Sequence, residues 1–579
     1  INYLSWLRLL VFLGAIGMLW LISPFSLTLS IVCFILLMLI FVVIIRLQSR
    51  LQDLSGLLQA KQQLMEKELQ ALNGEWPEFE NPDDPAMDTL SFAADLDIFG
   101  RGSLYQYINR TFSGIGENRL SYYLSDISTD RNMIHQRQQC IRELSDKHEW
   151  IINYYAIGKQ NKLSNHKYTR LLSWAGSEKK KYWSSGMYLL LSIAIPAIQS
   201  IMLILLITGV INGYHFLVSL LAALAINGLF LRRINRVHNS ISKTYDLLLT
   251  TSGLIQQIEK TPFNSAMAKQ LQSQLHHEGI SPAGQLRKLS KIVSALDNRL
   301  NILVGIFLNA LVMWDLQQMI RLEKWHHRFG HKVPEWISVT AEFEALCSLA
   351  FFAINHPGFS FAELSDTPGL LEAVEAGHPL IDKKRRVCNN FIMQQQGQFV
   401  VITGANMAGK STFLRTIGVN IVLAASGTVV CAKKWNYFPV KLLTGIRISD
   451  NLLNNESYFY AELKRLQQIV ESKKQGEKSM ILLDEILRGT NSSDKHRGTV
   501  LLLKKLLSLN GAGIIATHDI SIGSLEKELP GKIVNHCFEV ELENNELYFD
   551  YKLKPGISQK LNASFLLEKM GIVDAATDI

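Results

Sequence analysis

Two long stretches without a charged side chain constrain the fold of this chain more than any other feature. Leu9 to Ile45 and Tyr182 to Leu231 contain no Asp, Glu, Lys or Arg. An α-helix needs about 20 apolar residues to cross a bilayer. The second stretch is long enough for two helices that fold back on one another, and the first is long enough when Trp6 and Leu7 are added. Across the 579 residues, 48% are hydrophobic and only 19% are charged, which indicates membrane segments beside a globular part.

Each apolar stretch contains a turn signal near its middle. The sequence SPFS at residues 23–26 carries Pro24, which disfavours helix at the residue before it, and TGVINGYH at residues 208–215 carries two glycines. We therefore predict a first transmembrane hairpin at residues 1–46, with spans at about 6–24 and 27–45. A second hairpin is predicted at residues 182–231, with spans at about 186–208 and 214–231.

Basic residues flank both hairpins and are absent from the two connecting turns. They are Arg8, Arg46, Arg50, Lys179, Lys180, Lys181, Arg232, Arg233 and Arg236. The positive-inside rule then predicts a multi-pass protein of the cytoplasmic (inner) membrane, in contact with membrane lipids, with its soluble domains facing the cytoplasm. Much of the net charge of +8 is thereby assigned to anchoring rather than to DNA. Two alternatives stay open: apolar core hairpins in a soluble protein, and a signal peptide in place of the first span.

The remaining sequence predicts two kinds of globular structure. Residues 47–94 predict a helix leaving the membrane and then a linker rich in Pro, Asn and Asp. Residues 95–181 and 232–378 carry long helical patterns, within which we expect the apolar run 302–314 to be a buried helix. From residue 379 to 579 we predict an α/β domain, because the short apolar runs FVVIT, SMILLDE and GAGIIATH alternate with helices.

The segment TGANMAGKST, residues 403–412, predicts a nucleotide site. It contains the pattern G-x-x-x-x-G-K-[ST] as Gly404, Gly409, Lys410 and Ser411, after a predicted strand and before a predicted helix. In such a loop the backbone amides face phosphates. The amides here include those of Ala405, Asn406, Met407, Ala408 and Thr412. Lys410 would neutralise the β/γ oxygens and Ser411 would bind Mg²⁺, so ATP and Mg²⁺ are the predicted cofactors. A chance glycine-rich turn is the alternative interpretation.

Two further strand ends carry candidate catalytic side chains. SMILLDE ends in Asp484, placed to hold Mg²⁺, and Glu485, placed to polarise the attacking water. IIATHD ends at His518, which would sense the γ-phosphate or orient water. The alternatives are a solvated strand end for the acidic pair and an ordinary hydrogen-bonding role for the histidine.

Taken together, these motifs and several flanking segments resemble the DNA mismatch repair MutS proteins, a family within the ABC-type ATPases. The resemblance includes Ala405 at a position where the family usually has Pro. The segments that carry it are residues 96–124, 370–381, 403–412, 450–466, LLDEILRGTNSSD, ATHD and 551–572.

The resemblance implies a fold, a partner and further site residues. The fold would be multi-domain: α-helical membrane hairpins and an all-α MutS-type core, followed by an α/β P-loop ATPase domain. The partner would be a second copy, a homodimer held partly by residues 551–572, with two composite sites. Asn406 would sit in the phosphate loop, Ser457 would reach the partner's γ-phosphate, and Asn389 would approach the base. Asn491 and Ser492 would form the D-loop at the interface.

The resemblance also sets expectations about what this chain lacks. It starts at Leu96, so we expect no counterpart of the family's mismatch-recognition and connector domains. The second hairpin falls inside the helical core, which leaves a DNA clamp between residues 233 and 297 an open question. KKRR, residues 383–386, is expected to be a solvated turn before the ATPase domain, with a phosphate-binding patch as the alternative.

Three functional hypotheses follow. The first is a membrane-anchored, MutS-like dimeric ATPase whose hairpins transmit the movement driven by ATP. The alternatives are an ATP-dependent DNA-structure-binding protein related to mismatch repair, and an ABC-type transporter component. Against the transporter, NNESYFYAE differs from LSGGQ, the spans carry no charge, and no transported substrate is identified.

Overall fold

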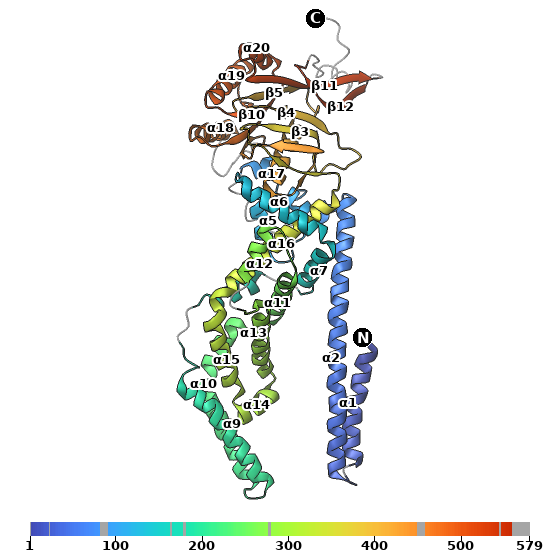
Figure 1. Ribbon diagram of the computed structural model, residues 1–579, viewed down its shortest axis with the longest axis vertical. Coiled ribbons are helices and arrows are strands. Elements are labelled where there is room, and N and C mark those ends of the chain that lie inside the picture. Colours follow the sequence, from blue (N-terminus) through green and yellow to red (C-terminus); the bar gives the residue numbers. More distant parts are fainter. Residues whose placement is uncertain are drawn as a thin grey trace. The chain divides into compact units, whose positions relative to one another are not determined.

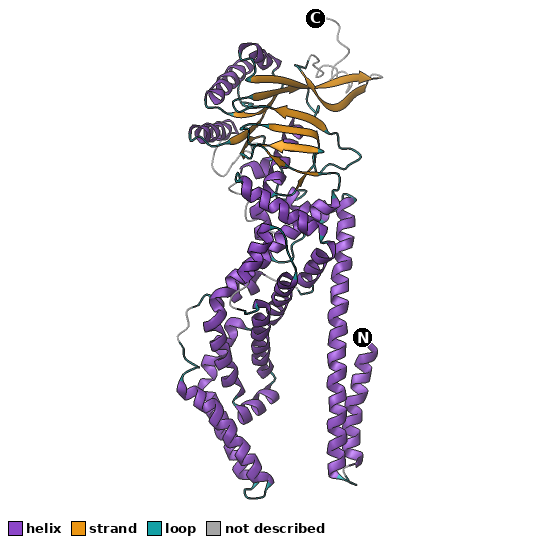
Figure 2. Cartoon of the chain, in the orientation of Figure 1, coloured by secondary structure: helices purple, strands orange, loops and turns teal. Residues whose placement is uncertain are grey.

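The computed structural model describes residues 2–22, 24–80, 91–161, 165–177, 181–275, 279–447, 458–543 and 546–558. Contacts divide the chain into two compact units, each formed from three segments. Unit 1 comprises Ile1–Leu69, Glu149–Ile258 and Ile280–Pro334, and unit 2 comprises Gln70–His148, Glu259–Gly279 and Glu335–Ile579. Helices dominate the chain, and the strands lie in its C-terminal part (Figures 1 and 2).

Unit 1 is built from helices. Its elements are α1 (Asn2–Ile22), α2 (Leu27–Leu72, whose last residues enter unit 2), α7 (His148–Lys159), α8 (Asn165–Ala175), α9 (Gly186–Ile207), α10 (Gly213–Ile241), α11 (Tyr245–Lys260), α13 (Pro282–Asp297), η2 (Asn298–Leu300), α14 (Ile302–Val312), α15 (Trp314–Phe329) and η3 (Gly330–Lys332).

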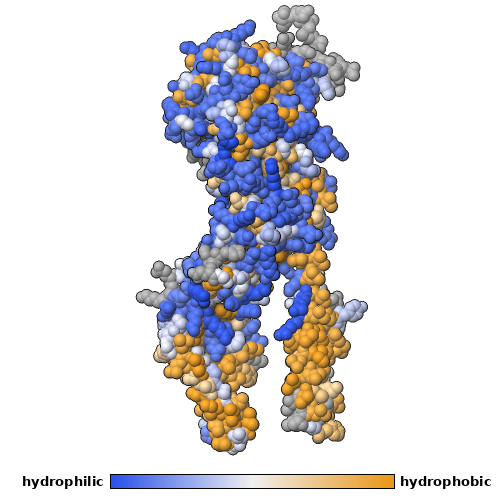
Figure 3. Space-filling model, viewed as in Figure 1, coloured by the Kyte–Doolittle hydropathy of each residue, from blue (hydrophilic) through white to orange (hydrophobic). Residues whose placement is uncertain are grey.

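Four helical segments of unit 1 are long and apolar enough to cross a membrane, by length and composition. They are Tyr3–Leu21, Val32–Leu72, Gly186–Ile207 and Gly213–Ile241, and at most 17% of the most apolar part of each is buried. A fifth segment with these properties, Trp314–Asn355, is 78% buried there, which is typical of a packed interior. Figure 3 shows the apolar surfaces of α1 with α2 and of α9 with α10.

Polar side chains on the apolar helices hydrogen-bond across each pair. Nε2 of Gln48 donates to Oγ of Ser5 at 2.9 Å, joining α2 to α1. Nε2 of Gln199 donates to the carbonyl oxygen of Ser219 at 2.9 Å, and the Ser219 hydroxyl donates back to Oε1 of Gln199 at 2.9 Å, joining α9 to α10. Such bonds stabilise polar groups between apolar helices. Oε1 of Gln48 itself has no hydrogen-bond partner among the described residues.

The expectation that residues 302–314 form a buried helix is confirmed only in part, because Asn309, Ala310 and Met313 are buried but other residues are exposed. The helix α14 exposes Val304, Ile306 and Phe307 and packs against α9 and α10. Asp297 and Asp315, which flank the run, are both paired. Asp297 pairs with His238, and Asp315 pairs with Arg299.

Unit 2 combines short helices with two main sheets. Its helices are α3 (Ser91–Asp95), α4 (Leu104–Ile108), α5 (Gly114–Ser125), α6 (Arg131–Asp146), α12 (Ala266–Leu275), α16 (Val333–Asn355), α17 (Lys410–Ser426), α18 (Tyr458–Lys474), α19 (Ser492–Ser508) and α20 (Leu525–Glu528), with 3₁₀ segments η1 (Trp76–Glu78) and η5 (Ile520–Ser524). Its strands are β1 (Ser360–Phe361), β2 (Glu363–Leu364), β3 (Leu371–Ala376), β4 (Asn389–Met393), β5 (Phe399–Gly404), β6 (Val429–Val430), β7 (Lys434–Tyr437), β8 (Lys441–Gly445), β9 (Ser479–Asp484), β10 (Ala512–Thr517), β11 (Ile533–Glu543) and β12 (Glu546–Pro555).

The larger sheet confirms the predicted α/β domain with mostly parallel strands. Its order is β12-β11-β5-β10-β9-β8, and within this sheet, as far as its strands are described, only the β11–β12 pair is antiparallel. The runs FVVIT, SMILLDE and GAGIIATH form β5, β9 and β10, which are buried along their whole length. Because these strands are parallel, their carboxyl ends and the loops that follow lie along one edge of the sheet.

Helices from the earlier part of the chain complete the core around α17. The guanidinium of Arg137 donates to the carbonyl oxygen of Ala425 at 3.2 Å, and the Ser426 hydroxyl donates to that of Tyr123 at 2.8 Å. The Thr428 hydroxyl donates to the carbonyl oxygen of Leu349 on α16 at 3.0 Å. These contacts explain why the borders of unit 2 differ from the predicted domain limits at residues 181 and 378.

Candidate functional site

The loop between β5 and α17 depends on two glycines for its shape. Gly404 has φ +149° and Gly409 has φ +107°, conformations that side chains strongly disfavour. A Cβ atom at residue 404 would lie 2.5 Å from the carbonyl oxygen of Phe538, so only glycine fits there. Gly409 is the N-cap of α17, which places the amino end of this 17-residue helix directly at the loop. Backbone N–H groups at such a position favour anions.

Lys410 is turned back onto the loop that precedes it. Its Nζ donates to the carbonyl oxygens of Gly404 at 2.9 Å and Ala405 at 2.8 Å. The side chain is 4% exposed, and burial lowers the pKa of Lys410 while the carboxylates of Glu485 and Asp484 oppose that shift. The geometry places a buried cation in the loop beside two carboxylates.

Asp484 lies at the end of β9 and contacts the first turn of α17. Burial raises the pKa of Asp484, and a hydrogen bond with the Ser411 side chain opposes the change. Its Oδ1 atom is buried and has no hydrogen-bond partner in the described part of the chain. A buried carboxylate oxygen without a partner is costly unless a cation or donor completes it.

Glu485 and His518 face each other across the ends of β9 and β10. The His518 Nε2 atom forms an ion pair with Oε1 of Glu485, and this partner lowers the pKa of Glu485. The other ring nitrogen, Nδ1, lies 2.9 Å from the carbonyl oxygen of Gly404 and 3.3 Å from Nζ of Lys410. The histidine therefore connects the carboxylate to the glycine loop.

The backbone after β9 is held in an unusual conformation. Glu485 has φ +47° and Leu487 has φ +60°, both in the left-handed region. The amide of Glu485 donates to the carbonyl oxygen of Ala516 at 2.9 Å, and the amide of Leu487 donates to Oε1 of Glu462 on α18 at 2.6 Å. Left-handed backbone at non-glycine residues costs free energy and is common at functional sites. Here it directs the Glu485 side chain toward His518.

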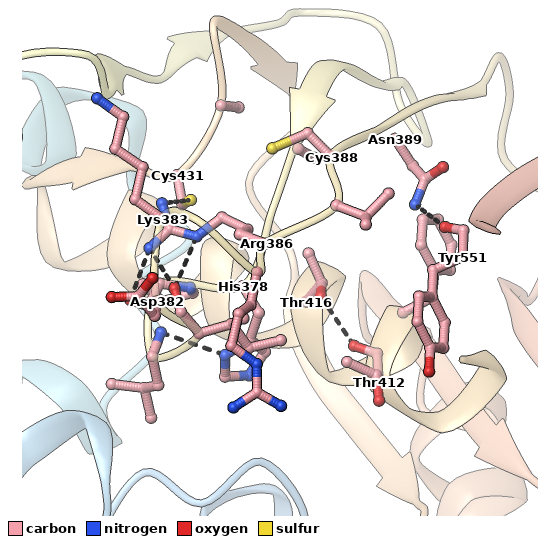
Figure 4. Close-up of a pocket in the computed structure, with 18 of the residues that line it drawn as sticks. His378, Asp382, Lys383, Arg386, Cys388, Asn389, Thr412, Thr416, Cys431 and Tyr551 are labelled. Carbon is pink, nitrogen blue, oxygen red and sulfur yellow. Dashed lines mark hydrogen bonds between the residues drawn. The ribbon is translucent and has the colours of Figure 1, made fainter. Parts of the chain in front are cut away.

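A cavity of about 1260 Å³ opens beside the loop. Figure 4 shows a group of the residues that line it, from the turn around Asp382 to Asn389 and Tyr551. Eight of the predicted site residues line this one cavity: Asn389, Asn406, Met407, Gly409, Lys410, Ser411, Thr412 and Glu485. Ala408 is buried beneath the loop. The structure thus brings the glycine loop and the acidic strand end together.

Two other predicted residues, Asn389 and Asn491, form hydrogen bonds with the backbone. Asn389 uses its amide on the backbone of β12, accepting from Leu553 N at 2.8 Å and donating to the Tyr551 carbonyl at 3.0 Å. Asn491 is the N-cap of α19 and accepts from the Asp494 amide at 2.8 Å, and Ser492 begins that helix. Ser457 and residues 559–572 of the predicted dimerisation segment lie outside the described residues.

Several residues that line the cavity were missed by the sequence analysis. Lys383, Lys384 and Arg385 form the exposed turn that was expected. Arg386 is only partly exposed, because its side chain folds back and its Nη2 donates to the Ile381 carbonyl at 2.6 Å. Its Nη1 lies 3.2 Å from Sγ of Cys431 (Figure 4). The HisPro pair at 378–379 was the available signal for a structured turn here. Nothing in the sequence around Tyr551 indicated its place beside the glycine loop.

The residues present fit a magnesium nucleotide. The orphaned Oδ1 of Asp484 and the neighbouring Ser411 hydroxyl are oxygen donors of the kind that Mg²⁺ prefers. No cluster of three His, Cys, Asp or Glu side chains suited to a metal occurs among the described residues. A magnesium ion here would therefore complete its coordination with phosphate and water oxygens, as is usual for nucleotide sites.

The C-terminal part of the chain is similar to known proteins. Residues 400–570 match the family model for MutS domain V. The DNA mismatch repair protein MutS of Thermotoga petrophila is 31% identical over 238 residues, 40% of this chain and 29% of the relative. The human MutS protein homolog 4 is 30% identical over 210 residues, 34% of this chain and 22% of the relative. The matches therefore span less than a third of these relatives' length.

Proposed function

Because its domain V makes this chain a member of the MutS family, we propose that it is a membrane-anchored ATPase that binds and hydrolyses Mg²⁺-ATP. The observation that carries the proposal is the convergence of Lys410, Ser411, Asp484, Glu485 and His518 at one edge of the sheet. A phosphate loop, a metal-binding carboxylate and a candidate general base are the parts that nucleotide hydrolysis requires.

Each side chain has a distinct task in this proposal. Lys410 and the amides at the start of α17 bind phosphate oxygens, and Ser411 and Asp484 hold the metal. Glu485 accepts a proton from the attacking water, a role that needs the ionised carboxylate that His518 favours. Bound Mg²⁺ would supply charge neutralisation on the phosphates.

Anchoring is the second part of the proposal. Helices α1, α2, α9 and α10 would form two transmembrane hairpins, supported by their length, their exposed apolar side chains and the basic residues at their ends. The protein would then reside in the cytoplasmic membrane with its ATPase domain in the cytoplasm.

The end of α2 suggests how the nucleotide site and the membrane communicate. The helix is continuous from Leu27 to Leu72, and Leu72 and Trp76 line the same cavity as Lys410. The segment after α2 is held by Gln106, whose Nε2 donates to the Phe79 carbonyl at 2.6 Å. A change in the cavity would therefore act directly on the residue that ends the helix, and movement driven by ATP would be transmitted through α2.

The proposed active form is a homodimer, as the MutS resemblance implies, with DNA as a candidate partner. The names of the relatives, DNA mismatch repair proteins among them, favour a DNA-linked alternative function. Under that alternative, DNA of a particular structure would be bound near the membrane in response to ATP. Affinity that falls steeply with salt would be its signature, because phosphate contacts release counterions.

The test is the ATPase rate of the detergent-solubilised full chain, with and without duplex, mismatched and branched DNA. We expect Mg²⁺-dependent hydrolysis in the absence of DNA. Stimulation by one DNA structure only would favour the DNA-linked alternative. No hydrolysis with any DNA, by protein that sediments as a folded species, would contradict the proposed activity.

A further inference from the structure

The helix α14 is too short to cross a bilayer, although it is uncharged. It has 11 residues, Ile302–Val312, with the sequence ILVGIFLNALV. At 1.5 Å per residue it is about 16 Å long, roughly half of the hydrocarbon thickness of a bilayer. A transmembrane role is therefore excluded by length alone.

Part of the α14 surface is packed and part is exposed. Gly305, Asn309 and Ala310 are buried, and the helix contacts α9 and α10. Val304, Ile306 and Phe307 are 42%, 48% and 63% exposed. The helices α9 and α10, against which α14 packs, are themselves apolar on their exposed sides. Figure 3 shows hydrophobic surface over α9 and α10. Contiguous apolar surface of this kind marks a contact with another phase or molecule.

Polar contacts link the residues before and after α14 to one another and to α10. Before the helix, Arg299 contacts Asn235 of α10 and Asp297 pairs with His238 of α10 at 2.7 Å. After the helix, Asp315 pairs with Arg299 at 3.0 Å, with side chains 2% and 9% exposed. Asn235 and His238 lie just beyond Arg232 and Arg233, where the apolar part of α10 ends. Both ends of α14 are thus tied to the charged end of an apolar helix.

We infer that α14 lies in the plane of the membrane interface beside α9 and α10, with Val304, Ile306 and Phe307 inserted among lipids. The inference rests on the proposed function, in which α9 and α10 span the membrane. In this position the exposed apolar side chains of α14 would lie among acyl chains, while the charged pairs at its ends would stay at the headgroup level. Continuity with the apolar surfaces of α9 and α10 favours lipid as the occupant over a second protein.

Site-specific fluorescence quenching tests this placement. Cys33 and Cys388, the two half-buried cysteines, are replaced by Ser, and single cysteines are introduced as Phe307→Cys, Ile201→Cys or Leu501→Cys. Ile201 on α9 is 57% exposed and reports on the proposed span, and Leu501 on α19 is 59% exposed and reports on water. Each variant carries an environment-sensitive fluorophore in phosphatidylcholine/phosphatidylglycerol vesicles containing nitroxide-labelled lipid.

We expect the labels at 307 and 201 to be quenched at least twofold by lipid nitroxide and protected from aqueous iodide, with the opposite pattern at 501. Iodide quenching at 307 together with lipid quenching at 201 would overturn the inference and leave the membrane spans in place. Protection at 307 from both quenchers would also overturn it, because a second protein would then cover the helix. Absence of lipid quenching at 201 would contradict the proposed anchoring itself.

Discussion

The Nζ atom of Lys410 and the Nδ1 atom of His518 lie 3.3 Å apart, and both contact the carbonyl oxygen of Gly404. The two residues are 108 positions apart in the chain. Adjacent parallel strands, β5 and β10, bring them together. The glycine loop and the histidine at the end of β10 therefore form one connected unit, which also includes Glu485.

Removal of the Lys410 ammonium should abolish most nucleotide binding. We expect Lys410→Ala to weaken the affinity for a fluorescent ATP analogue at least 100-fold, because a buried cation beside the glycine loop is lost. Lys504→Ala is the matched control, since Lys504 lies on α19 in an exposed ion pair with Glu528. Equal affinity of the two variants in equilibrium titrations would remove Lys410 from its assigned role.

His518 should control the pH range of hydrolysis through Glu485. The histidine lowers the pKa of Glu485, so the carboxylate stays ionised, and competent as a base, as the pH falls. In His518→Ala the pKa of Glu485 should rise, and the acid limb of the pH–kcat profile should move to higher pH. A profile of unchanged shape with a uniformly lower rate would show that the histidine acts in another way.

Glu344 should make stability depend on pH. Burial raises its pKa to about 8, although hydrogen bonds from Ser113 and Phe112 oppose the shift. Between the ordinary value of 4.5 and about 8 the folded chain holds a proton that the unfolded chain releases, so stability falls as the pH rises through this window. The loss should be on the order of a few kcal/mol.

The glutamine side chain in Glu344→Gln cannot ionise, so the stability of this variant should depend less on pH. Thermal unfolding in detergent from pH 5 to 8 measures this dependence. Glu372→Gln, which alters a surface pair with Lys434, should retain it. Parallel curves for wild type and Glu344→Gln would contradict the assignment.

Gly116 should be intolerant of any side chain. It lies in the first turn of α5, and a Cβ atom there would collide with the carboxylate of Glu344 on α16. We expect Gly116→Ala to destabilise the protein by about 1–3 kcal/mol, as overpacking of a buried contact usually does. Gly284→Ala, in α13 with only ordinary contacts, should be neutral or stabilising by up to about 1 kcal/mol. Calorimetric midpoints in the reverse order would refute this packing argument.

Local patterns predicted the backbone structure around the candidate nucleotide site. The glycine loop, the buried strands on either side of it and the acidic end of β9 are encoded in short segments, and each formed where it was expected. The surroundings of Asn389 could not be predicted, because its amide is used by the backbone of β12, which lies more than 150 residues later. The exposure of α14 was also missed, since the pairing of Asp315 with Arg299 is visible only in three dimensions.

The most direct test of the central claim is nucleotide turnover by the full chain reconstituted in lipid nanodiscs, compared between wild type and Glu485→Gln. The variant keeps Lys410, Ser411 and Asp484, so it should bind Mg²⁺-ATP with nearly wild-type affinity. Without the carboxylate base it should hydrolyse ATP at least 100-fold more slowly. Equal turnover of the two proteins, or failure of the wild type to bind Mg²⁺-ATP at all, would contradict the claim that this edge of the sheet is an ATPase site.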